Sequence, residues 1–382
     1  MSTPRLRIAL IGPARFGIAE PCAGGLEAHT LTTARGLRRR GHEVVVFAGP
    51  GDVAMPPDLT VVPVLERSVD TTGEARADIS MPGSALADLE RGYARVLAAI
   101  DLLGDVDLVH NNSLHALPAS FDGRGRCGVV HVLHCPPLGD VEEAHRARQA
   151  DPADTHRVLS VSRSLARSWS DVRSCVVWNG VDVDVWHPRD RARLGGRRRP
   201  PGEVVWAGRI VSEKAPHLAI DAARLAGRPI ALAGPIQEPD YHASQVVPRL
   251  GPGVEYLGHL GCAELAELYA GADVGLVTPR WEEPFGLVAA ELLSCGTPVA
   301  GFARGALPDL VRPDVGALAP ADDVAALAGA IEEASGRSRE DCRRYALERL
   351  STDVMVAAYE AHYERALLDE RLGATARPMA AG

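Results

Sequence analysis

Features that mark several common protein classes are missing from this 382-residue chain. Its seven cysteines are odd in number and include no Cys-x-x-Cys pair, so reduced thiols are favoured over a disulfide framework. No apolar run is long enough to cross a bilayer, and the run Ile8–Ile11 is too short for a signal peptide. We therefore expect a soluble, cytoplasmic protein without stable membrane insertion.

An excess of positive charge is missing as well. The formal net charge is −9 and the pI is near 5.8, whereas a general nucleic-acid binder is normally basic, so no nucleic-acid partner is expected. Hydrophobic residues make up 46% of the chain, as in a globular protein. The length is sufficient for two domains, each with its own core.

The two familiar nucleotide-binding loops are also absent. Residues Gly12–Gly17 follow the first apolar run, but Ile18 stands where a Walker loop needs lysine, and no Gly-x-Gly-x-x-Gly occurs there. ATPase and dehydrogenase functions are therefore disfavoured. No Asp-x-Asp follows a predicted strand as a magnesium anchor, because Asp182 and Asp184 lie close to a predicted linker.

Lysine is almost absent: among 41 basic residues, only Lys214 is a lysine. It lies five residues after Arg209, beyond the apolar run Val204–Ala207. Arginine is a planar fork that grips an anion at two points, and lysine is a compact point charge. Such a pair suits a diphosphate better than a single carboxylate. The alternative is a surface lysine that compositional drift left by chance.

Short apolar runs alternate with helical patterns, which predicts parallel sheets covered on both faces. The predicted strands are Leu6–Ile11, Val44–Phe47, Val61–Leu65, Leu108–His110, Val129–Leu133, Val158–Val161, Cys175–Val177, Val204–Ala207, Ile230–Ala233, Val254–Leu257, Val274–Thr278 and Val299–Gly301. Predicted helices include Gly25–Arg40 and Ser84–Ile100. After Val311 the pattern is helical to the end, with helices at Val324–Ala334, Arg339–Leu350 and Met355–Leu368.

The strand series restarts after a Pro- and Gly-rich break with six arginines between Arg189 and Arg199. We interpret this break as a solvated linker, with a membrane- or phosphate-binding segment as the alternative. The predicted parts are an N-terminal domain (1–183), a linker (184–202), a C-terminal domain (203–352) and a terminal helix with a frayed tail (353–382).

Three segments are candidate sites. Gly24-Gly25 precedes a helix and lets a ligand approach backbone amides at the positive end of the helix dipole, although an ordinary helix start is equally compatible. His131 and His134 suggest a metal site, but residues three apart on a strand point to opposite faces. His134 follows a strand end, where open α/β sheets hold ligands; a structural histidine is the alternative.

The third segment is Glu282–Leu287, with Glu291 eight residues after Glu283. Eight helical residues rise about 12 Å, whereas the two carboxyl groups of a glycosidase lie about 5 to 9.5 Å apart. The two glutamates are therefore better placed to touch two parts of one long ligand. Glu291 lies near the apolar stripe of its helix and should have a partner, such as a pair of ribose hydroxyls. An exposed helix glutamate without a function is the alternative.

Together these motifs resemble the retaining GT-B glycosyltransferases of family 4 over essentially the whole chain. The motifs are Gly24-Gly25-Leu26-Glu27, Arg40-Gly41-His42, Asn179-Gly180-Val181-Asp182, Gly208-Arg209 with Glu213-Lys214, and Glu283 to Glu291 followed by Cys295-Gly296-Thr297-Pro298-Val299. The resemblance implies an α/β fold with two doubly wound Rossmann-like domains facing a central cleft, and a C-terminal helix that packs back on the N-terminal domain. The departures are Ala215, where the family often has glycine, and Leu292, where it often has alanine.

The resemblance also implies roles for individual residues. Arg209 and Lys214 would bind the donor diphosphate, Glu283 the hydroxyls of the transferred sugar, and Glu291 the donor ribose. His134 would contact the sugar and Gly25 would face the diphosphate. The backbone amides of Gly286 and Leu287 would lie near sugar and phosphate, and Val288 would belong to the same donor-binding set. His134, Glu283, Arg209 and Lys214 form the expected catalytic set.

The implied reaction is transfer of a sugar, with retention, from a nucleoside diphosphate sugar to a small-molecule acceptor. Two preplaced cations can stabilise the leaving diphosphate, so we expect metal independence and no cofactor, with a uridine diphosphate donor as the default. In this class the leaving phosphate takes the acceptor's proton. Alternatives are a nucleotide-sugar epimerase or pseudo-glycosyltransferase of the same fold, and a non-catalytic sugar-binding protein. The acceptor and the oligomeric state stay open; candidate acceptor residues are Arg15, Glu20, His110, Asn111, Asn112 and His115.

Overall fold

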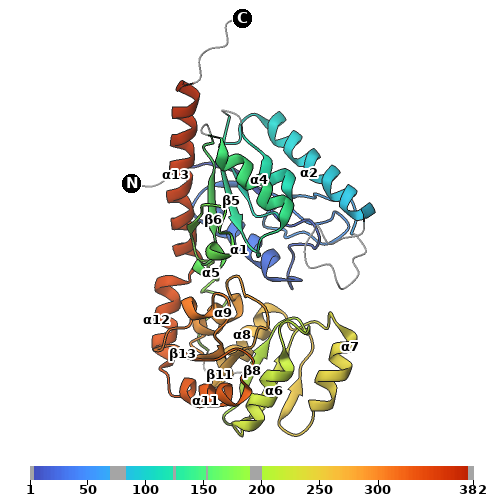
Figure 1. The fold of residues 1–382 in the computed structure, drawn as a ribbon, viewed down its shortest axis with the longest axis vertical. Coiled ribbons are helices and arrows are strands. Elements are labelled where there is room, and N and C mark those ends of the chain that lie inside the picture. Colours follow the sequence, from blue (N-terminus) through green and yellow to red (C-terminus); the bar gives the residue numbers. More distant parts are fainter. Residues whose placement is uncertain (1–3, 69–82, 124–125, 152–153, 190–199, 377–382) are drawn as a thin grey trace, which may run out of the picture. The chain divides into compact units, whose positions relative to one another are not determined.

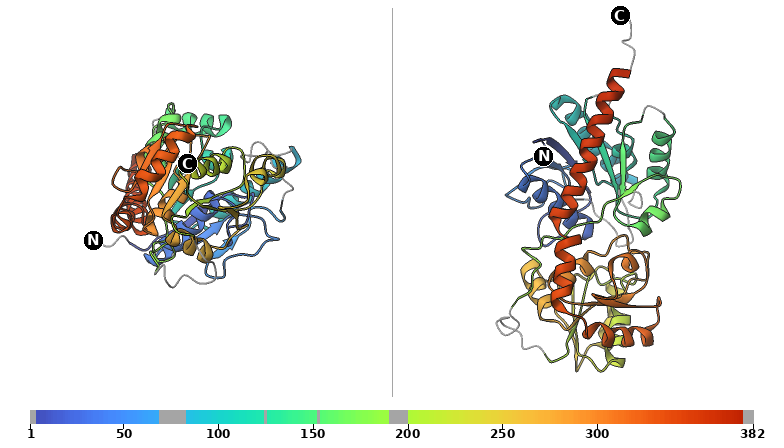
Figure 2. Two further views of the ribbon diagram at one scale, coloured as in Figure 1. Left: turned by 90° about the horizontal axis from the view of Figure 1, so that it is seen from below. Right: turned by 90° about the vertical axis from the view of Figure 1, so that its left-hand side faces the viewer.

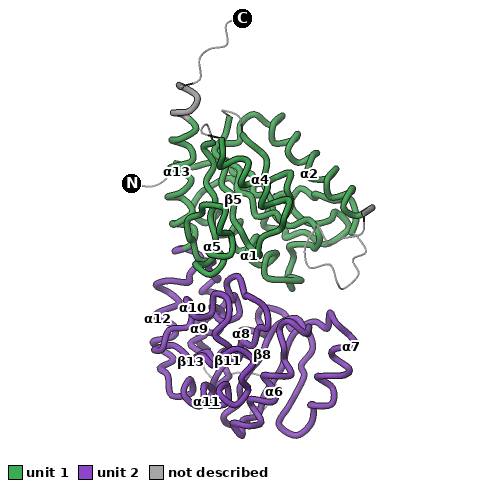
Figure 3. The backbone as a smooth tube through the Cα atoms, viewed as in Figure 1, with its two compact units in different colours: residues 1–178, 355–382 green, residues 179–354 purple. Residues whose placement is uncertain are grey.

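The computed structural model describes residues 4–68, 83–123, 126–151, 154–189 and 200–376 (Figure 1). Contacts divide the chain into two compact units, which Figure 3 colours separately. The first unit holds Met1–Trp178 and Met355–Gly382, and the second holds Asn179–Val354. The arginine-rich centre of the predicted linker (190–199) and the end of the predicted tail (377–382) lie outside the described residues.

The first unit is built on a seven-stranded parallel sheet in the order β3-β2-β1-β4-β5-β6-β7. Its central strands are apolar on both faces because helices cover both sides of a sheet of this type. The strands are β1 Arg7–Ile11, β2 Glu43–Phe47, β3 Thr60–Val62, β4 Leu108–Asn111, β5 Gly128–Leu133, β6 Arg157–Ser160 and β7 Cys175–Val176. The helices are α1 Gly25–Arg39, α2 Gly83–Leu103, α3 Ala116–Ser120, α4 Gly139–Ala150, α5 Arg163–Ser168 and the later part of α13 Thr352–Ala376.

The second unit contains a six-stranded parallel sheet in the order β10-β9-β8-β11-β12-β13. Its strands are β8 Val204–Ala207, β9 Ile230–Ala233, β10 Val254–Tyr256, β11 Val274–Val277, β12 Val299–Phe302 and β13 Gly316–Ala319. Its helices are α6 Pro216–Leu225, α7 Pro239–Tyr241, α8 Cys262–Gly271, α9 Leu287–Ser294, α10 Leu307–Leu310, α11 Val324–Ser335 and α12 Arg339–Arg349.

In both sheets the order in which strands are added reverses after the third strand of the unit, so that the fourth strand pairs with the first. In the first unit β1 lies between β2 and β4, and in the second β8 lies between β9 and β11. The loops that follow the two neighbouring strands then diverge, which leaves a place for ligands at the carboxyl ends of the strands. The candidate residues of each unit follow these strands or their neighbours.

One sequence prediction is wrong: the chain is not helical throughout after Val311, because β13 pairs with β12. This strand has the sequence Gly-Ala-Leu-Ala, which contains no β-branched residue and so has a weak intrinsic strand signal. A Cβ atom on Gly316 would lie 2.2 Å from the carbonyl oxygen of Val299, so the strand pairing itself needs the glycine.

The C-terminal helix α13 packs on the first unit, as predicted (Figure 2). Tyr359 and Tyr363, one turn apart, are fully buried. Glu360 accepts hydrogen bonds from Arg40 Nε at 2.8 Å and from His42 Nε2 at 3.0 Å. The predicted Arg-Gly-His turn is therefore the place where α13 is held. Gly41 follows α1 with a φ of +94°, the left-handed conformation in which a glycine commonly ends a helix.

Candidate functional site

The loops after β8 and β11 lie side by side because the two strands are parallel neighbours, with Trp206 opposite Leu276. Two further contacts join these loops. The Thr278 hydroxyl donates to the carbonyl oxygen of Lys214 at 3.0 Å, and the Arg280 amide donates to that of Glu213 at 2.7 Å. The strand pairing thereby brings Lys214 and the predicted glutamate segment to one edge of the sheet.

Lys214 forms an ion pair with Glu283 within the second unit. The indole nitrogen of Trp281 donates to the same carboxylate oxygen, Oε2 of Glu283, at 3.0 Å. The ammonium nitrogen of Lys214 also lies 4.9 Å from the centre of the Trp281 ring, a cation–π contact. The single lysine of the chain is thus held by a carboxylate and an aromatic face, with 22% of its side chain exposed.

Arg209 is held in a similar way on the loop after β8. Its Nη2 pairs with Glu213 at 2.7 Å and its Nη1 donates to Gln237 Oε1 at 3.0 Å. Both cations that the sequence assigns to a diphosphate are therefore balanced by glutamates and remain partly exposed.

The backbone around Glu283 is fixed by residues 305 and 306. The Gly305 amide donates to Glu282 Oε2 at 2.9 Å, and the Ala306 amide donates to the carbonyl oxygen of Glu283 at 2.8 Å. A Cβ atom on Gly305 would lie 2.3 Å from the backbone nitrogen and oxygen of Glu283. Gly286, with a φ of +95°, directly precedes α9. The first amides of a helix have no partner within it, so this end of α9 can bind an anion or a hydroxyl.

Glu291 lies on α9 beside the buried Tyr269, partly buried itself. Burial raises the pKa of the Glu291 carboxyl to about 8, and the neighbouring Tyr269 hydroxyl opposes that shift. Within the described part of the chain Glu291 forms no ion pair. A carboxyl group in such surroundings gains from any ligand that donates hydrogen bonds to its ionised form.

In the first unit, His134 lies just beyond β5 in a network of uncharged groups. Its Nε2 lies 2.9 Å from Oδ1 of Asn112, and Nε2 of the buried His110 lies 2.9 Å from the same oxygen. The ring of His29 lies 4.8 Å from that of His134. Burial lowers the pKa of His29 to about 3 and that of His110 to about 4, and it lowers the pKa of His134 well below 6.5. All three imidazoles are neutral at pH 7.

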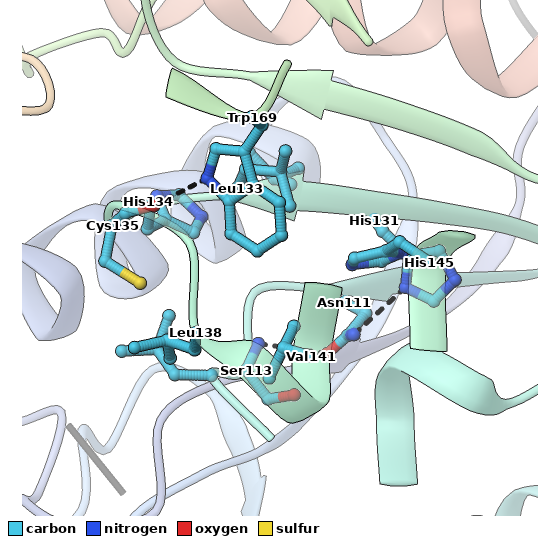
Figure 4. A pocket seen from close by; sticks show the side chains of 12 residues that line it. Asn111, Ser113, His131, Leu133, His134, Cys135, Leu138, Val141, His145 and Trp169 are labelled. Atoms are coloured by element: carbon cyan, nitrogen blue, oxygen red, sulfur yellow. Dashed lines mark hydrogen bonds between the residues drawn. The ribbon is translucent and has the colours of Figure 1, made fainter. Parts of the chain in front are cut away.

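His131 belongs to a different cluster, as its position on the strand predicts. Asn111 Nδ2 lies 3.0 Å from His131 Nδ1, and His131 Nε2 lies 3.3 Å from His156 Nδ1. Figure 4 shows His131 and His145 beside Asn111 at a pocket that also has His134 and Cys135 in its lining. None of the residues that line this pocket is an aspartate, glutamate, lysine or arginine.

The predicted acceptor residues have different surroundings. Asn111 is buried, and its Oδ1 accepts from the Ser113 amide at 2.9 Å, so both ends of its amide group are bonded within the protein. His115 begins α3 by accepting from the Leu117 amide. These two side chains therefore support the site from within the protein.

Two further acceptor candidates, Arg15 and Glu20, are more accessible than the buried His110 and Asn112. Glu20 forms an ion pair with Arg35 at 2.6 Å, and the Arg15 guanidinium stacks 4.7 Å from the Phe16 ring. Gly25 is the first residue of α1, after an extended Gly24 that gives no side-chain cap. The first amides of a helix have no partner within it, so the predicted approach of a ligand to this helix start stays a prediction.

Sequence reasoning missed Trp281, Gly305 and the connection between Asn112 and two histidines. Trp281 had a usable signal, since an aromatic residue stands directly before two glutamates. Gly305 and the Asn112 contacts join segments far apart in the sequence, and no spacing rule indicates them. Over the described residues, no group of three or more His, Cys, Asp or Glu side chains is suited to hold a metal ion. No described helix combines the length and the apolar character that a membrane crossing requires.

Two family models match the chain. Residues 23–185 match Glycosyltransferase Family 4, and residues 201–336 match Glycosyl transferases group 1. The chain is 31% identical to D-inositol 3-phosphate glycosyltransferase of Mycobacterium marinum, over 96% of this chain and 87% of that protein.

Solved structures agree with the fold. Sucrose-phosphate synthase from Thermosynechococcus elongatus matches with a TM-score of 0.74 and 20% identity, over 97% of this chain and 100% of that one. An Anabaena protein solved with UDP and glucose matches with a TM-score of 0.69 and 18% identity, over 94% and 100%. These matches and the two parallel sheets confirm the predicted α/β class with two Rossmann-like units.

Proposed function

The chain belongs to the group 1 glycosyltransferases of family 4, and we propose that it transfers a sugar, with retention, from a nucleoside diphosphate sugar to a small polar acceptor. The observation that carries the proposal is the pairing of Lys214 with Glu283 on the loops of two neighbouring strands. The Lys214 ammonium suits a phosphate, the Glu283 carboxylate suits sugar hydroxyls, and the two groups lie in contact.

Donor binding exchanges the partners of this pair. The diphosphate takes the place of Glu283 beside Lys214, and Arg209 grips it as a fork after leaving Glu213. The Glu283 carboxylate is then released to accept hydrogen bonds from the hydroxyls of the transferred sugar. Glu291 accepts hydrogen bonds from the donor ribose. The backbone amides of Gly286, Leu287 and Val288 donate hydrogen bonds to the sugar and the phosphate. In the first unit, we propose that His134 forms a hydrogen bond with a hydroxyl group of a substrate.

Charge on the leaving group explains how the reaction is accelerated. As the bond to the sugar breaks, negative charge grows on the diphosphate, where Lys214 and Arg209 stabilise it without needing to reorganise. The same phosphate takes the proton of the acceptor hydroxyl. This scheme uses no metal and no further cofactor. A uridine diphosphate sugar is the first donor to test, because a protein of similar fold was solved with UDP and glucose.

The proposal is tested by incubating the protein with nucleoside diphosphate sugars and a set of acceptors that includes inositol phosphates, since a relative is named for that acceptor. We expect nucleotide release that depends on both substrates and persists in the presence of a metal chelator. Conversion of the donor without an acceptor would indicate an epimerase instead. Tight donor binding without release of nucleotide would indicate a sugar-binding protein.

A further inference from the structure

A chain of buried polar contacts runs from the C-terminal helix to His134 within the first unit. The Tyr363 hydroxyl on α13 lies 2.6 Å from Nδ1 of His110. Nε2 of His110 lies 2.9 Å from Oδ1 of Asn112, and Nε2 of His134 lies 2.9 Å from that same oxygen. Tyr363, His110 and Asn112 have no exposed surface, so water does not compete for these contacts.

The direction of each hydrogen bond follows from the donors available. A neutral imidazole carries one proton, on one of its two nitrogens, and an amide carbonyl oxygen can only accept. The distance of 2.6 Å between Tyr363 and His110 is typical of a hydroxyl donor and short for an imidazole N–H donor. The tyrosine therefore donates to Nδ1 of His110, which leaves the proton of His110 on Nε2.

The position of the proton on His110 in turn constrains Asn112 and His134. Nε2–H of His110 donates to Oδ1 of Asn112, which turns the carbonyl end of the amide toward both histidines. His134 meets that oxygen with its own Nε2 and must donate as well. Its proton is then on Nε2, and the lone pair of Nδ1 is left to accept a hydrogen bond. His134 is partly exposed, unlike the three groups behind it.

We propose that Tyr363 is a positioning residue that fixes, through His110 and Asn112, the Nε2–H tautomer of His134. In this state His134 presents a hydrogen-bond acceptor to a ligand hydroxyl. The role of His134 toward the sugar rests on the proposed function, but the tautomer of His134 does not. The C-terminal helix thus contributes to the chemistry of the site as well as to the packing of the first unit.

Tyr363→Phe removes one hydroxyl and keeps the ring. Without the donor, His110 can carry its proton on either nitrogen, Asn112 can turn, and His134 loses its single tautomer. Tyr359→Phe is the matched control, because Tyr359 is equally buried one turn away on α13 and its ring stacks 6.3 Å from that of Tyr363. Its hydroxyl lies 3.4 Å from His29 Nε2 and is not part of the chain to His134.

The experiment is ¹⁵N NMR of the imidazole nitrogens in the full-length protein, with the His134 signals assigned by their loss in His134→Gln. We expect an Nε2–H pattern for His134 in the wild type and in Tyr359→Phe, and a mixture of tautomers in Tyr363→Phe. The kcat of Tyr363→Phe should fall about fivefold to tenfold, the worth of one hydrogen bond, with unchanged UDP affinity. Tyr359→Phe should stay within twofold of the wild-type kcat.

Two results would overturn the inference: an Nδ1–H tautomer of His134 in the wild type, or an unchanged His134 pattern in Tyr363→Phe. If Tyr363→Phe does not fold, Asn112→Leu removes the shared acceptor, keeps the branching of the side chain and must release the His134 tautomer in the same way. The NMR readout needs no substrate. A protein that transfers no sugar but shows the expected tautomers would contradict the proposed function and leave the inference standing.

Discussion

The first unit builds its polar region from neutral side chains, whereas the second unit uses charged ones. Around Asn112, three histidines have pKa values lowered by burial and carry no charge at pH 7. At the same edge of the second sheet, Lys214 and Arg209 each pair with a glutamate and stay partly exposed. Two sheets with the same strand order therefore present different chemistry at their carboxyl ends.

The difference matches what each half of the proposed reaction needs. A leaving diphosphate requires cations, and these must stay close to water in the empty protein because burying them alone is very unfavourable. A sugar or acceptor hydroxyl requires neutral donors and acceptors in defined directions, which buried histidines and amides provide. In the proposed reaction, the first unit orients hydroxyl groups and the second unit stabilises the negative charge of the diphosphate.

Removing the positive charge of Lys214 from the second unit should have the largest effect on kcat. Lys214→Ala should lower kcat by about 10²–10³-fold, the range for losing one preplaced donor to a developing anion. Lys214→Arg should also be impaired, because a planar guanidinium group cannot reproduce the compact charge of the ammonium group beside Trp281. Thermal unfolding should stay close to that of the wild type.

Arg344→Ala is the matched control for this experiment. Arg344 lies in the same unit and pairs with Asp341 on the exposed face of α12. Arg344→Ala should leave kcat unchanged, because Arg344 is not among the proposed donor-binding residues. It should also leave stability nearly unchanged, since surface ion pairs contribute little to stability. A Lys214→Arg protein with the wild-type rate would contradict the assigned role of the lysine.

The charged loop is held by backbone contacts, so a single methyl group should disturb it. Gly305→Ala places a Cβ atom 2.3 Å from the backbone of Glu283, at a φ of +60°. We expect a loss of about 1–3 kcal/mol in the free energy of unfolding, with a higher KM for the donor. Gly329→Ala, where no atom lies within 4 Å of the new Cβ, is the control. Equal unfolding midpoints for the two variants in urea would refute the proposed backbone contact.

The two units should respond to pH in opposite directions. His29 and His110 have folded-state pKa values of about 3 and about 4, below the ordinary 6.5. The unfolded chain therefore takes up protons that the folded first unit does not. The stability of the first unit is retained above pH 6.5 and is lost as the pH falls from 6.5 toward 4.

Glu291 has the reverse effect in the second unit. Its pKa is raised from 4.5 to about 8, so its contribution to stability is present below pH 4.5 and is lost as the pH rises through 8. Hydrogen exchange, corrected for the intrinsic rate at each pH, resolves the two units. Glu291→Gln should remove the alkaline loss in the second unit and leave the acid loss in the first. A Glu291→Gln protein with an unchanged alkaline loss would show that another group is responsible.

The smallest effect concerns the loop that carries the lysine. Ala215 has a φ of +49° and a ψ of +53°, a left-handed conformation that disfavours any residue with a Cβ atom. Ala215→Gly should therefore raise the free energy of unfolding by up to about 1 kcal/mol, with little change in kcat. Ala325→Gly, on the exposed face of α11, should instead destabilise by about 1 kcal/mol. Destabilisation by both substitutions would remove the argument from backbone strain.

The sequence predicted the fold well because buried parallel strands are continuous apolar runs. Val204–Ala207 and Ile230–Ala233 were predicted with the bounds that the structure has. The strand Gly316–Ala319 could not be predicted in this way, since its identity depends on pairing with β12 and not on its own residues.

The site was predicted in part. The sequence selected Lys214 and Glu283 because their residue types and spacing suggested a diphosphate and a sugar, but not that they pair with each other. The effect of Tyr363 on His134 passes through residues 110 and 112, more than two hundred positions away in the chain. Contacts of this kind depend on how α13 packs on the first unit, and no local pattern contains that information.

The most direct test of the account is the anomeric configuration of the product formed from an α-linked nucleoside diphosphate sugar. Proton NMR during turnover gives that configuration from the coupling of the anomeric proton, before any slow equilibration. A retaining enzyme forms an α-linked product from this donor. Both the wild type and the slow Lys214 variants should therefore give the α-linked product. A β-linked product would contradict the retaining mechanism on which the assigned roles of Lys214, Arg209 and Glu283 depend.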